Sequence, residues 1–195
     1  MLEVQTASPV RTRRLVVRCW QPEDAPLLKR AIDTSLDQLR PWMPWALHEP
    51  STLEVVEARL AGFQERFGAG KDWLYGIFDA AETEVVGGAG LHHRSGPDVL
   101  EIGYWIRADV TGRGYATEAA NALTAVGFDV LGARHVEIRC DPRNVKSMNV
   151  PRRLGYRHVQ TLSEDVLPPG GAPRDTMVWS LSAAEYVDRN ATWAR

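Results

Sequence analysis

The sequence lacks the features that would place it in several common protein classes. Its two cysteines, Cys19 and Cys140, lie far apart and form no CxxC pair, so neither a zinc site nor a disulfide framework is expected. No apolar run approaches the roughly 20 residues that cross a bilayer, and the N-terminal residues contain no signal-peptide core. We therefore expect a cytoplasmic protein without a membrane partner.

An excess of charge of one sign is also missing. The chain has 23 basic and 25 acidic residues and a net charge of −2, so no overall positive field attracts nucleic acid. Two phosphate-loop signatures are absent as well, because the chain has no GxxxxGK(S/T) loop and no complete GxGxxG fingerprint. A nucleotide-binding domain is therefore only a minor alternative.

Hydrophobic periodicity predicts strands and helices within a single domain. The 195 residues, 44% of them hydrophobic, suit one compact core. The predicted strands are residues 15–20, 73–78, 85–93, 99–106, 135–140, 156–162 and 175–181, and the predicted helices are residues 22–39, 53–67, 115–131, 144–154 and 183–188. Short turns join the middle strands and helices join the later ones, which predicts a mixed α/β sheet with helices on both faces.

A glycine-containing loop at the start of a helix is the most informative segment. Gly112 and Gly114 follow a predicted strand and stand just before the helix. The first amides of a helix have no internal partner and lie at the positive end of its dipole, while glycine lets a bulky anion approach. Arg113 adds positive charge and Thr117 a hydroxyl, so the loop suits a diphosphate. The alternative is an ordinary helix start with a glycine turn.

Two motifs in the sequence resemble those of a known family. Residues 101–123, EIGYWIRADVTGRGYATEAANAL, resemble the acetyl-CoA motif of GNAT acetyltransferases in the form found in the RimJ/RimL branch. Asn144 and Ser147, followed by the LGY of residues 154–156, resemble the second motif of that branch. The likeness runs from about residue 11 to residue 187, which indicates one GNAT domain over residues 1–195.

The resemblance implies a mixed, mostly antiparallel sheet that splits in a V between two central parallel strands, where the pantetheine arm of acetyl-CoA lies. It implies that backbone groups of Ile106 and Ala108 bind the pantetheine amides and that the glycine turn holds the pyrophosphate. The full set of coenzyme residues that it implies is Ile106, Ala108, Gly112, Arg113, Gly114, Tyr115, Ala116, Thr117, Asn144, Ser147 and Tyr156. One departure is Thr111, which stands where the superfamily pattern has glutamine or arginine.

Acetyl transfer to an amine needs a base, a polarised thioester carbonyl and a proton for the leaving thiolate. Direct attack in a ternary complex needs no cysteine nucleophile. The resemblance implies that Glu101 is the base, directly or through water, although a strand-end acid in a salt bridge is the alternative. It implies that Ser147 is the acid, or at least a hydrogen-bond donor to the coenzyme sulfur. Asn144, three residues earlier on the same helical face, either binds the pantetheine arm or simply caps the helix, and both roles are compatible.

The acceptor side is assigned to aromatic and histidine residues. Trp42 and Trp45 lie on a proline-stiffened loop that borders the acceptor site in the family, and they suit an apolar or cationic group; the alternative is a loop packed on the core. His92 and His93 point to opposite faces of a strand, so no metal site is expected. We assign His93 to the acceptor cleft, with a secondary base role as an alternative.

The resulting hypothesis is an N-acetyltransferase that acts on a protein N-terminal α-amine or a small-molecule amine. Two alternatives remain: a transferase that uses a larger acyl-CoA such as succinyl-CoA, and a GNAT fold that senses acyl-CoA without turnover. The loop at residues 167–171 is expected to close over the acceptor. The seven tryptophans are compatible with a homodimer.

Overall fold

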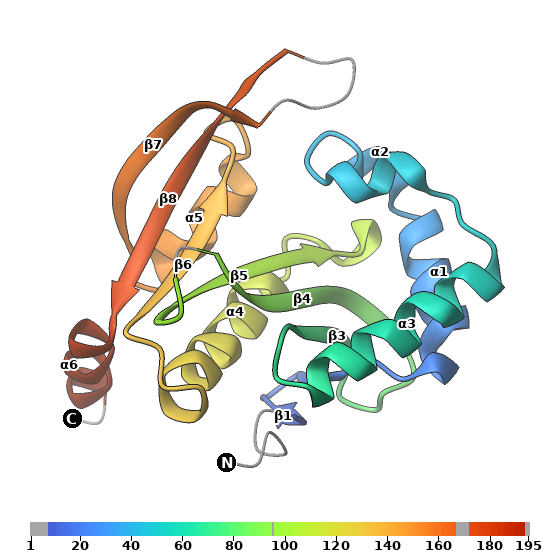
Figure 1. Ribbon diagram of the computed structural model, residues 1–195, viewed down its shortest axis with the longest axis horizontal. Coiled ribbons are helices and arrows are strands. Elements are labelled where there is room, and N and C mark those ends of the chain that lie inside the picture. The colour runs from blue at the N-terminus through green and yellow to red at the C-terminus, as the bar shows by residue number, and fades with distance from the viewer. Residues whose placement is uncertain (1–7, 95, 167–171, 194–195) are drawn as a thin grey trace.

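A mixed eight-stranded sheet organises the protein, whose computed structural model describes residues 8–94, 96–166 and 172–193 (Figure 1). The strands are β1 (Val10–Arg11), β2 (Leu15–Cys19), β3 (Trp73–Asp79), β4 (Val85–His93), β5 (Val99–Ile106), β6 (His135–Cys140), β7 (Arg157–Val166) and β8 (Arg174–Ser182). Their order in the sheet is β1-β2-β3-β4-β5-β6-β8-β7. Within the described residues β5 and β6 are the parallel pair, and the other neighbours are antiparallel.

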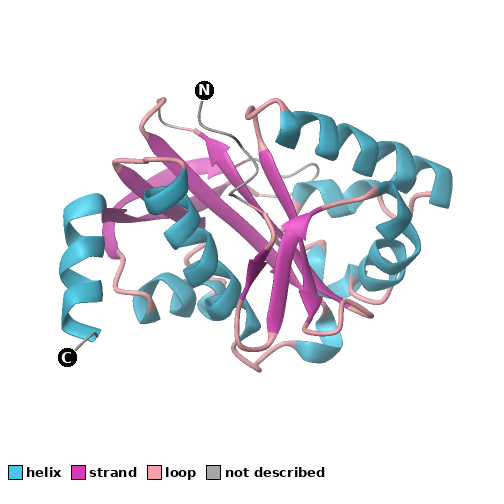
Figure 2. Cartoon of the chain, turned by 90° about the horizontal axis from the view of Figure 1, so that it is seen from below, coloured by secondary structure: helices cyan, strands magenta, loops and turns pink. Residues whose placement is uncertain are grey.

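Helices cover both faces of this sheet (Figure 2). They are α1 (Ala25–Asp33), α2 (Leu36–Leu39), α3 (Leu53–Gly68), α4 (Tyr115–Ala125), α5 (Val145–Arg153) and α6 (Ala183–Trp193). Val16 joins the core beneath α1 and α3, whereas its neighbour Val17 joins the core beneath α4. This alternation is what a strand buried on both faces requires, and it confirms the predicted fold class.

The first predicted helix, over residues 22–39, is interrupted in the structure. A 3₁₀ turn at Pro22–Asp24 leads into α1, which ends at Asp33, and α2 begins at Leu36. The Thr34 hydroxyl donates to the Arg30 carbonyl at 2.8 Å, and the Ser35 hydroxyl donates to the Ala31 carbonyl at 2.7 Å. Such side chains compete with the backbone ladder, so the break is local in origin.

Three further elements differ from their predicted lengths. The helix predicted over residues 115–131 is α-helical only to Ala125 and ends in a π turn at Val126–Val130. There Gly127 approaches β6 so closely that an added Cβ would lie 2.9 Å from Val136. Strand β7 runs on to Val166, which pairs with Arg174 of β8 after a shift in register, and α6 runs on to Trp193.

Candidate active site

The pairing between β5 and β6 stops partway along β5 and leaves an opening, here called the split. The register ends where Ile102 meets Ile138, although both strands run on beyond this pair. The Arg107 N–H bonds a main-chain carbonyl of β4 at 2.8 Å. Because main-chain groups alternate along a strand, those of Tyr104 and Ile106 turn the other way, into the split. A ligand strand could add there to the free edge of β5.

The glycine loop lies at the end of this edge and opens α4. Gly112 and Gly114 both adopt left-handed backbone conformations, with φ of +78° and +82°. An added Cβ at Gly112 would meet nothing within 4 Å, so conformation rather than packing favours glycine. The first backbone bond of the helix runs from the Glu118 N–H to the Gly114 carbonyl at 3.0 Å. The amides of residues 115–117 therefore precede it without partners inside the helix, as an anion site needs.

Arg14, just before β2, covers the start of α4. Its Nε lies 2.7 Å from a Glu118 oxygen, it donates to the Arg113 carbonyl at 2.9 Å, and its guanidinium lies 4.6 Å from the centre of the Tyr115 ring. Burial alone would raise the pKa of Glu118, but hydrogen bonds from Thr12 and Arg14 outweigh it and lower that pKa. Arg14 thus lies beside the loop as the ion-pair partner of Glu118, and the loop sequence alone did not indicate this residue.

The two backbone positions expected to bind pantetheine already have protein partners. The Ile106 carbonyl accepts a hydrogen bond from Gln38 Nε2 at 3.2 Å. The Ala108 N–H donates to the buried Ser35 hydroxyl at 3.0 Å, and its carbonyl accepts from Thr111. Ala108 therefore offers no free backbone group, because the break between α1 and α2 presents Ser35 to it. At Ile106 only the half-buried Gln38 would have to move.

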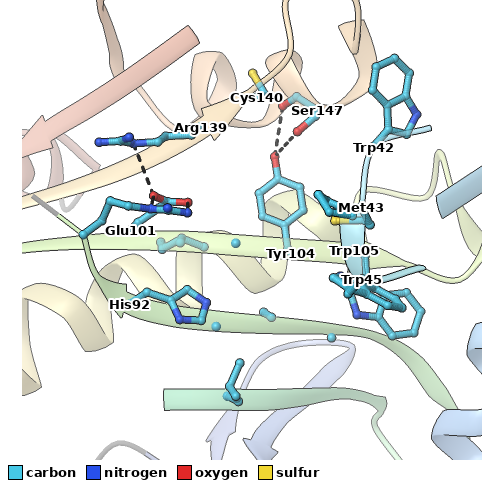
Figure 3. Close-up of a pocket in the computed structure, with 18 of the residues that line it drawn as sticks. Trp42, Met43, Trp45, His92, Glu101, Tyr104, Trp105, Arg139, Cys140 and Ser147 are labelled. Atoms are coloured by element: carbon cyan, nitrogen blue, oxygen red, sulfur yellow. Dashed lines mark hydrogen bonds and ion pairs between the residues drawn. The ribbon is translucent and has the colours of Figure 1, made fainter. Parts of the chain in front are cut away.

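Tyr104 and Ser147 meet across the split (Figure 3). The Tyr104 hydroxyl lies 3.1 Å from both the Ser147 hydroxyl and the Ser147 carbonyl. Asn144 caps α5, with its side-chain oxygen accepting the Ser147 N–H at 3.1 Å. Burial raises the pKa of Tyr104, so its hydroxyl keeps its proton at neutral pH. The pair can donate a hydrogen bond to an atom in the split.

Glu101 lies at the opposite end of the same stretch of β5, and it is buried. Arg94 Nε donates to its Oε2 at 2.6 Å, and Arg139 Nε lies 3.4 Å from the same atom (Figure 3). The hydrogen bond to Glu101 is the main cause of the raised pKa of Arg94. Glu101 therefore lines the cavity as a buried carboxylate that is ion-paired with two arginines.

A cavity of about 930 Å³ joins the split to the face of the sheet beneath α1 and α3. Tyr104 and Ser147 line it together with Trp42, Trp45 and Trp105. The rings of Trp45 and Trp105 have centroids 5.9 Å apart and an interplanar angle of 60°. Figure 3 shows the tryptophans gathered at one side of the space and Glu101 with Arg139 at the other. The cavity thus has an aromatic end and a charged end.

Residues 14–157 match the protein family described as Acetyltransferase (GNAT) domain. The chain belongs to the GNAT family. It is an acetyl-CoA-dependent N-acetyltransferase.

Similar proteins modify ribosomal proteins, according to their names. The chain is 26% identical over 178 residues to the [Ribosomal protein uS5]-alanine N-acetyltransferase of Escherichia coli, covering 90% of this chain and 91% of that one. The structure of the ribosomal-protein-S5-alanine acetyltransferase of Vibrio fischeri has a TM-score of 0.79 at 20% identity, with 90% and 96% covered. RimL, a ribosomal L7/L12 α-N-protein acetyltransferase in complex with coenzyme A, has a TM-score of 0.78 at 20% identity, with 88% and 95% covered.

The structure places Tyr156 and the two histidines of this GNAT site as follows. Tyr156, expected beside the coenzyme, is buried in the core, and its hydroxyl lies 2.7 Å from the Thr124 hydroxyl of α4. His92 lines the cavity instead of His93, which stacks edge-on against Trp73. The loop at residues 167–171 lies outside the described residues.

In the described part of the chain, no group of three or more His, Cys, Asp or Glu side chains is arranged to hold a metal ion. No helix in residues 8–94, 96–166 or 172–193 is both long enough and apolar enough to span a bilayer.

Proposed function

We propose that this GNAT enzyme transfers the acetyl group of acetyl-CoA directly to a primary amine while both substrates are bound. The continuity of the cavity carries this proposal, because Ser147 at the split and Trp45 beside the sheet line the same space. A thioester in the split and an amine in the cavity would then meet without a relay through the protein. Holding the two reactants together is itself a large part of such catalysis.

The glycine loop and the split would hold the coenzyme as substrate. The unpaired amides of residues 115–117, with Arg14 beside them, suit a pyrophosphate. The main-chain groups of Tyr104 and Ile106 suit the amides of a pantetheine arm, once Gln38 leaves the Ile106 carbonyl. The RimL structure named above contains coenzyme A, which supports this use of the fold.

The chain offers no reactive thiol for a covalent acetyl-enzyme. Cys140 lines the cavity, and burial raises its pKa to about 11. Its thiolate, which is the nucleophilic form, is therefore scarce at neutral pH. Direct attack of the amine is the simpler course.

The Ser147 and Tyr104 hydroxyls would serve the leaving sulfur. When the amine nitrogen bonds to the thioester carbon, the carbon–sulfur bond breaks and the thiolate needs a proton or a hydrogen bond. Ser147 can donate it, while Tyr104 supports Ser147 from the other side of the split. Glu101 would fix Arg94 and Arg139 at the charged end of the cavity rather than take a proton, because two guanidinium groups share its Oε2.

The acceptor we propose first is the N-terminal α-amine of a protein, and the second is a small amine. The names of the uS5 and L7/L12 enzymes support the first class. The volume of about 930 Å³ lies near the upper end of the usual range for ligand pockets, which leaves room for a peptide end.

Initial-rate kinetics test the direct mechanism. Varying acetyl-CoA at several fixed acceptor concentrations should give intersecting double-reciprocal lines, as a ternary complex requires, and Cys140→Ser should keep this pattern. Parallel lines, together with loss of transfer in Cys140→Ser, would instead indicate an acetyl-cysteine intermediate.

A further inference from the structure

His92 and Asp72 form a hydrogen-bonded pair at the edge of the cavity. His92 Nδ1 lies 2.5 Å from Asp72 Oδ1. The register pairs Trp73 of β3 with Leu91 of β4, so Asp72 comes opposite His92. A carboxylate only accepts hydrogen bonds, so Nδ1 carries the proton of the neutral ring. His92 Nε2 is thereby left with its lone pair free to take a proton.

His92 Nε2 lies over the sheet, in the space that the missing side chain of Gly90 leaves open. An added Cβ at Gly90 would lie 2.5 Å from His92 Nε2, and one at Gly103 would lie 3.9 Å from it. The ring therefore lies across β4 towards β5, in space that any side chain at Gly90 would occupy. Both glycines and His92 line the same cavity as Ser147. Figure 3 shows the imidazole beside β4, below Glu101.

The charged groups around this pair leave His92 as the available acceptor. Arg66 of α3 lies 4.0 Å from the second oxygen of Asp72. Glu101 stands opposite His92 in the β4–β5 register, where Arg94 and Arg139 hold it. Asp165 and Arg59 also line the cavity, where Arg59 is paired with Glu49 and Asp165 acts on Arg94. The remaining acidic, basic or histidine lining residues are Asp141, Arg174, Asp175 and His48, and Asp141 lies within 4 Å of both Arg143 and Arg174.

We infer that His92, oriented by Asp72, accepts the proton that the acceptor amine loses as it attacks the thioester. The inference rests on the proposed function. The amine nitrogen forms a bond to the carbonyl carbon, its proton passes to His92 Nε2, and the carbon–sulfur bond breaks. The thiolate takes a proton from the Ser147 hydroxyl, solvent water reprotonates Ser147, and His92 returns its own proton to solvent. Asp72 is a positioning residue that fixes the tautomer, as in other base–carboxylate pairs.

The test compares His92→Gln with His93→Gln in the full chain. Glutamine keeps hydrogen-bonding groups but cannot take a proton, and the exposed His93 is the matched control on the neighbouring position. We expect His92→Gln to lower kcat by roughly 100-fold, the contribution of a general base, with unchanged acetyl-CoA affinity and melting temperature. His93→Gln should keep the rate of the unaltered protein.

The pH dependence of kcat distinguishes a role of His92 as the base from a purely structural role. A histidine base gives a limb that rises with pH somewhere between roughly pH 5 and 8, because only the unprotonated ring accepts. This limb should remain when acceptors of different amine pKa are used, remain in Glu101→Gln, and vanish in His92→Gln. In Asp72→Asn it should move to lower pH, since loss of a carboxylate weakens the proton affinity of the ring.

Nitrogen NMR of the histidine rings gives a readout that does not depend on turnover. The unliganded protein should show His92, identified by its loss in His92→Gln, with a protonated Nδ1 and an unprotonated Nε2. The opposite tautomer, or a full pH limb in His92→Gln, overturns the inference while leaving acetyl transfer intact. Absence of any acceptor-dependent transfer by the unaltered protein overturns the proposed function, and this inference with it.

Discussion

The hydroxyl of Tyr104 on β5 lies 3.1 Å from the hydroxyl of Ser147 on α5, across the point where β5 and β6 part. This contact links β5, the strand that would bind the coenzyme arm, to α5, the helix that carries Ser147. It is also where the sulfur of a bound thioester would need a hydrogen-bond donor. The first prediction concerns this pair.

Ser147→Ala should lower kcat by roughly 10- to 100-fold, at the lower end of what a proton donor contributes. Tyr104→Phe should have a smaller effect, since it supports Ser147. In the double variant the loss should match that of Ser147→Ala alone, because the two hydroxyls act as one unit. Steady-state kinetics measure this, with acetyl-CoA affinity as the control. Purely additive losses would mean that the hydroxyls act separately.

Gly114→Asp should abolish acetyl-CoA binding. The backbone there has a φ of +82°, and a carboxylate at the start of α4 would repel a pyrophosphate. Gly114→Ala separates the two causes, because it adds strain of about 1–2 kcal/mol without charge. Gly62→Ala, within α3 where an added Cβ meets nothing within 4 Å, is the control and should leave binding unchanged. Calorimetric titration with acetyl-CoA measures the affinity of each variant. Undiminished affinity in Gly114→Asp would show that the pyrophosphate does not bind at this loop.

Glu118 should make folding stability depend on pH. Its pKa is lowered in the folded state by Thr12 and Arg14 against the opposing effect of burial. The unfolded chain therefore binds the proton more readily, and the contribution is complete above the ordinary glutamate pKa of roughly 4.3. It is lost as the pH falls towards the folded value. Denaturant unfolding between pH 7 and pH 3 should show the wild-type curve falling more steeply than that of Glu118→Gln, and parallel curves would contradict the assignment.

Gly88→Ala should disturb the aromatic end of the cavity. An added Cβ would lie 2.6 Å from Trp105 Nε1, so the indole must move. We expect kcat/KM for the acceptor to fall by roughly 10-fold or more, as small misplacements of a substrate can cause, with acetyl-CoA affinity unchanged. Acceptor titrations at saturating acetyl-CoA measure this. An unchanged kcat/KM for the acceptor would show that Trp105 is not part of the acceptor site.

Much of the fold could be predicted from the sequence because its signals are local. The polar turns around 79–84 and 95–98 delimited the segments 85–93 and 99–106 and so predicted β4 and β5 to the residue. Two glycines before an apolar helical stripe predicted the loop at α4 in the same way. The interruption after Asp33 was not predicted, because the apolar stripe continues through Leu36 and Leu39 while the Thr34 and Ser35 hydroxyls bond the Arg30 and Ala31 carbonyls.

The site was harder to predict because its contacts are long-range. Tyr104 lies within the motif that identified the family, but its bond to Ser147 joins residues 43 apart in the chain. Glu101 was predicted to be the base, with a salt-bridged acid as the alternative, and only the fold identifies Arg94 and Arg139 as its partners. The choice between His92 and His93 depended on which face of β4 meets the cavity. Strand alternation separates the two residues but does not say which one faces inward.

The most direct test is acceptor-dependent release of free thiol from acetyl-CoA, measured against peptides with varied N-termini and against small amines. The account predicts release that requires one class of primary amine, together with an acceptor whose mass increases by one acetyl group. Tight acetyl-CoA binding without thiol release in the presence of any amine would contradict the account. Thiol release from a larger acyl-CoA but not from acetyl-CoA would assign a different acyl donor.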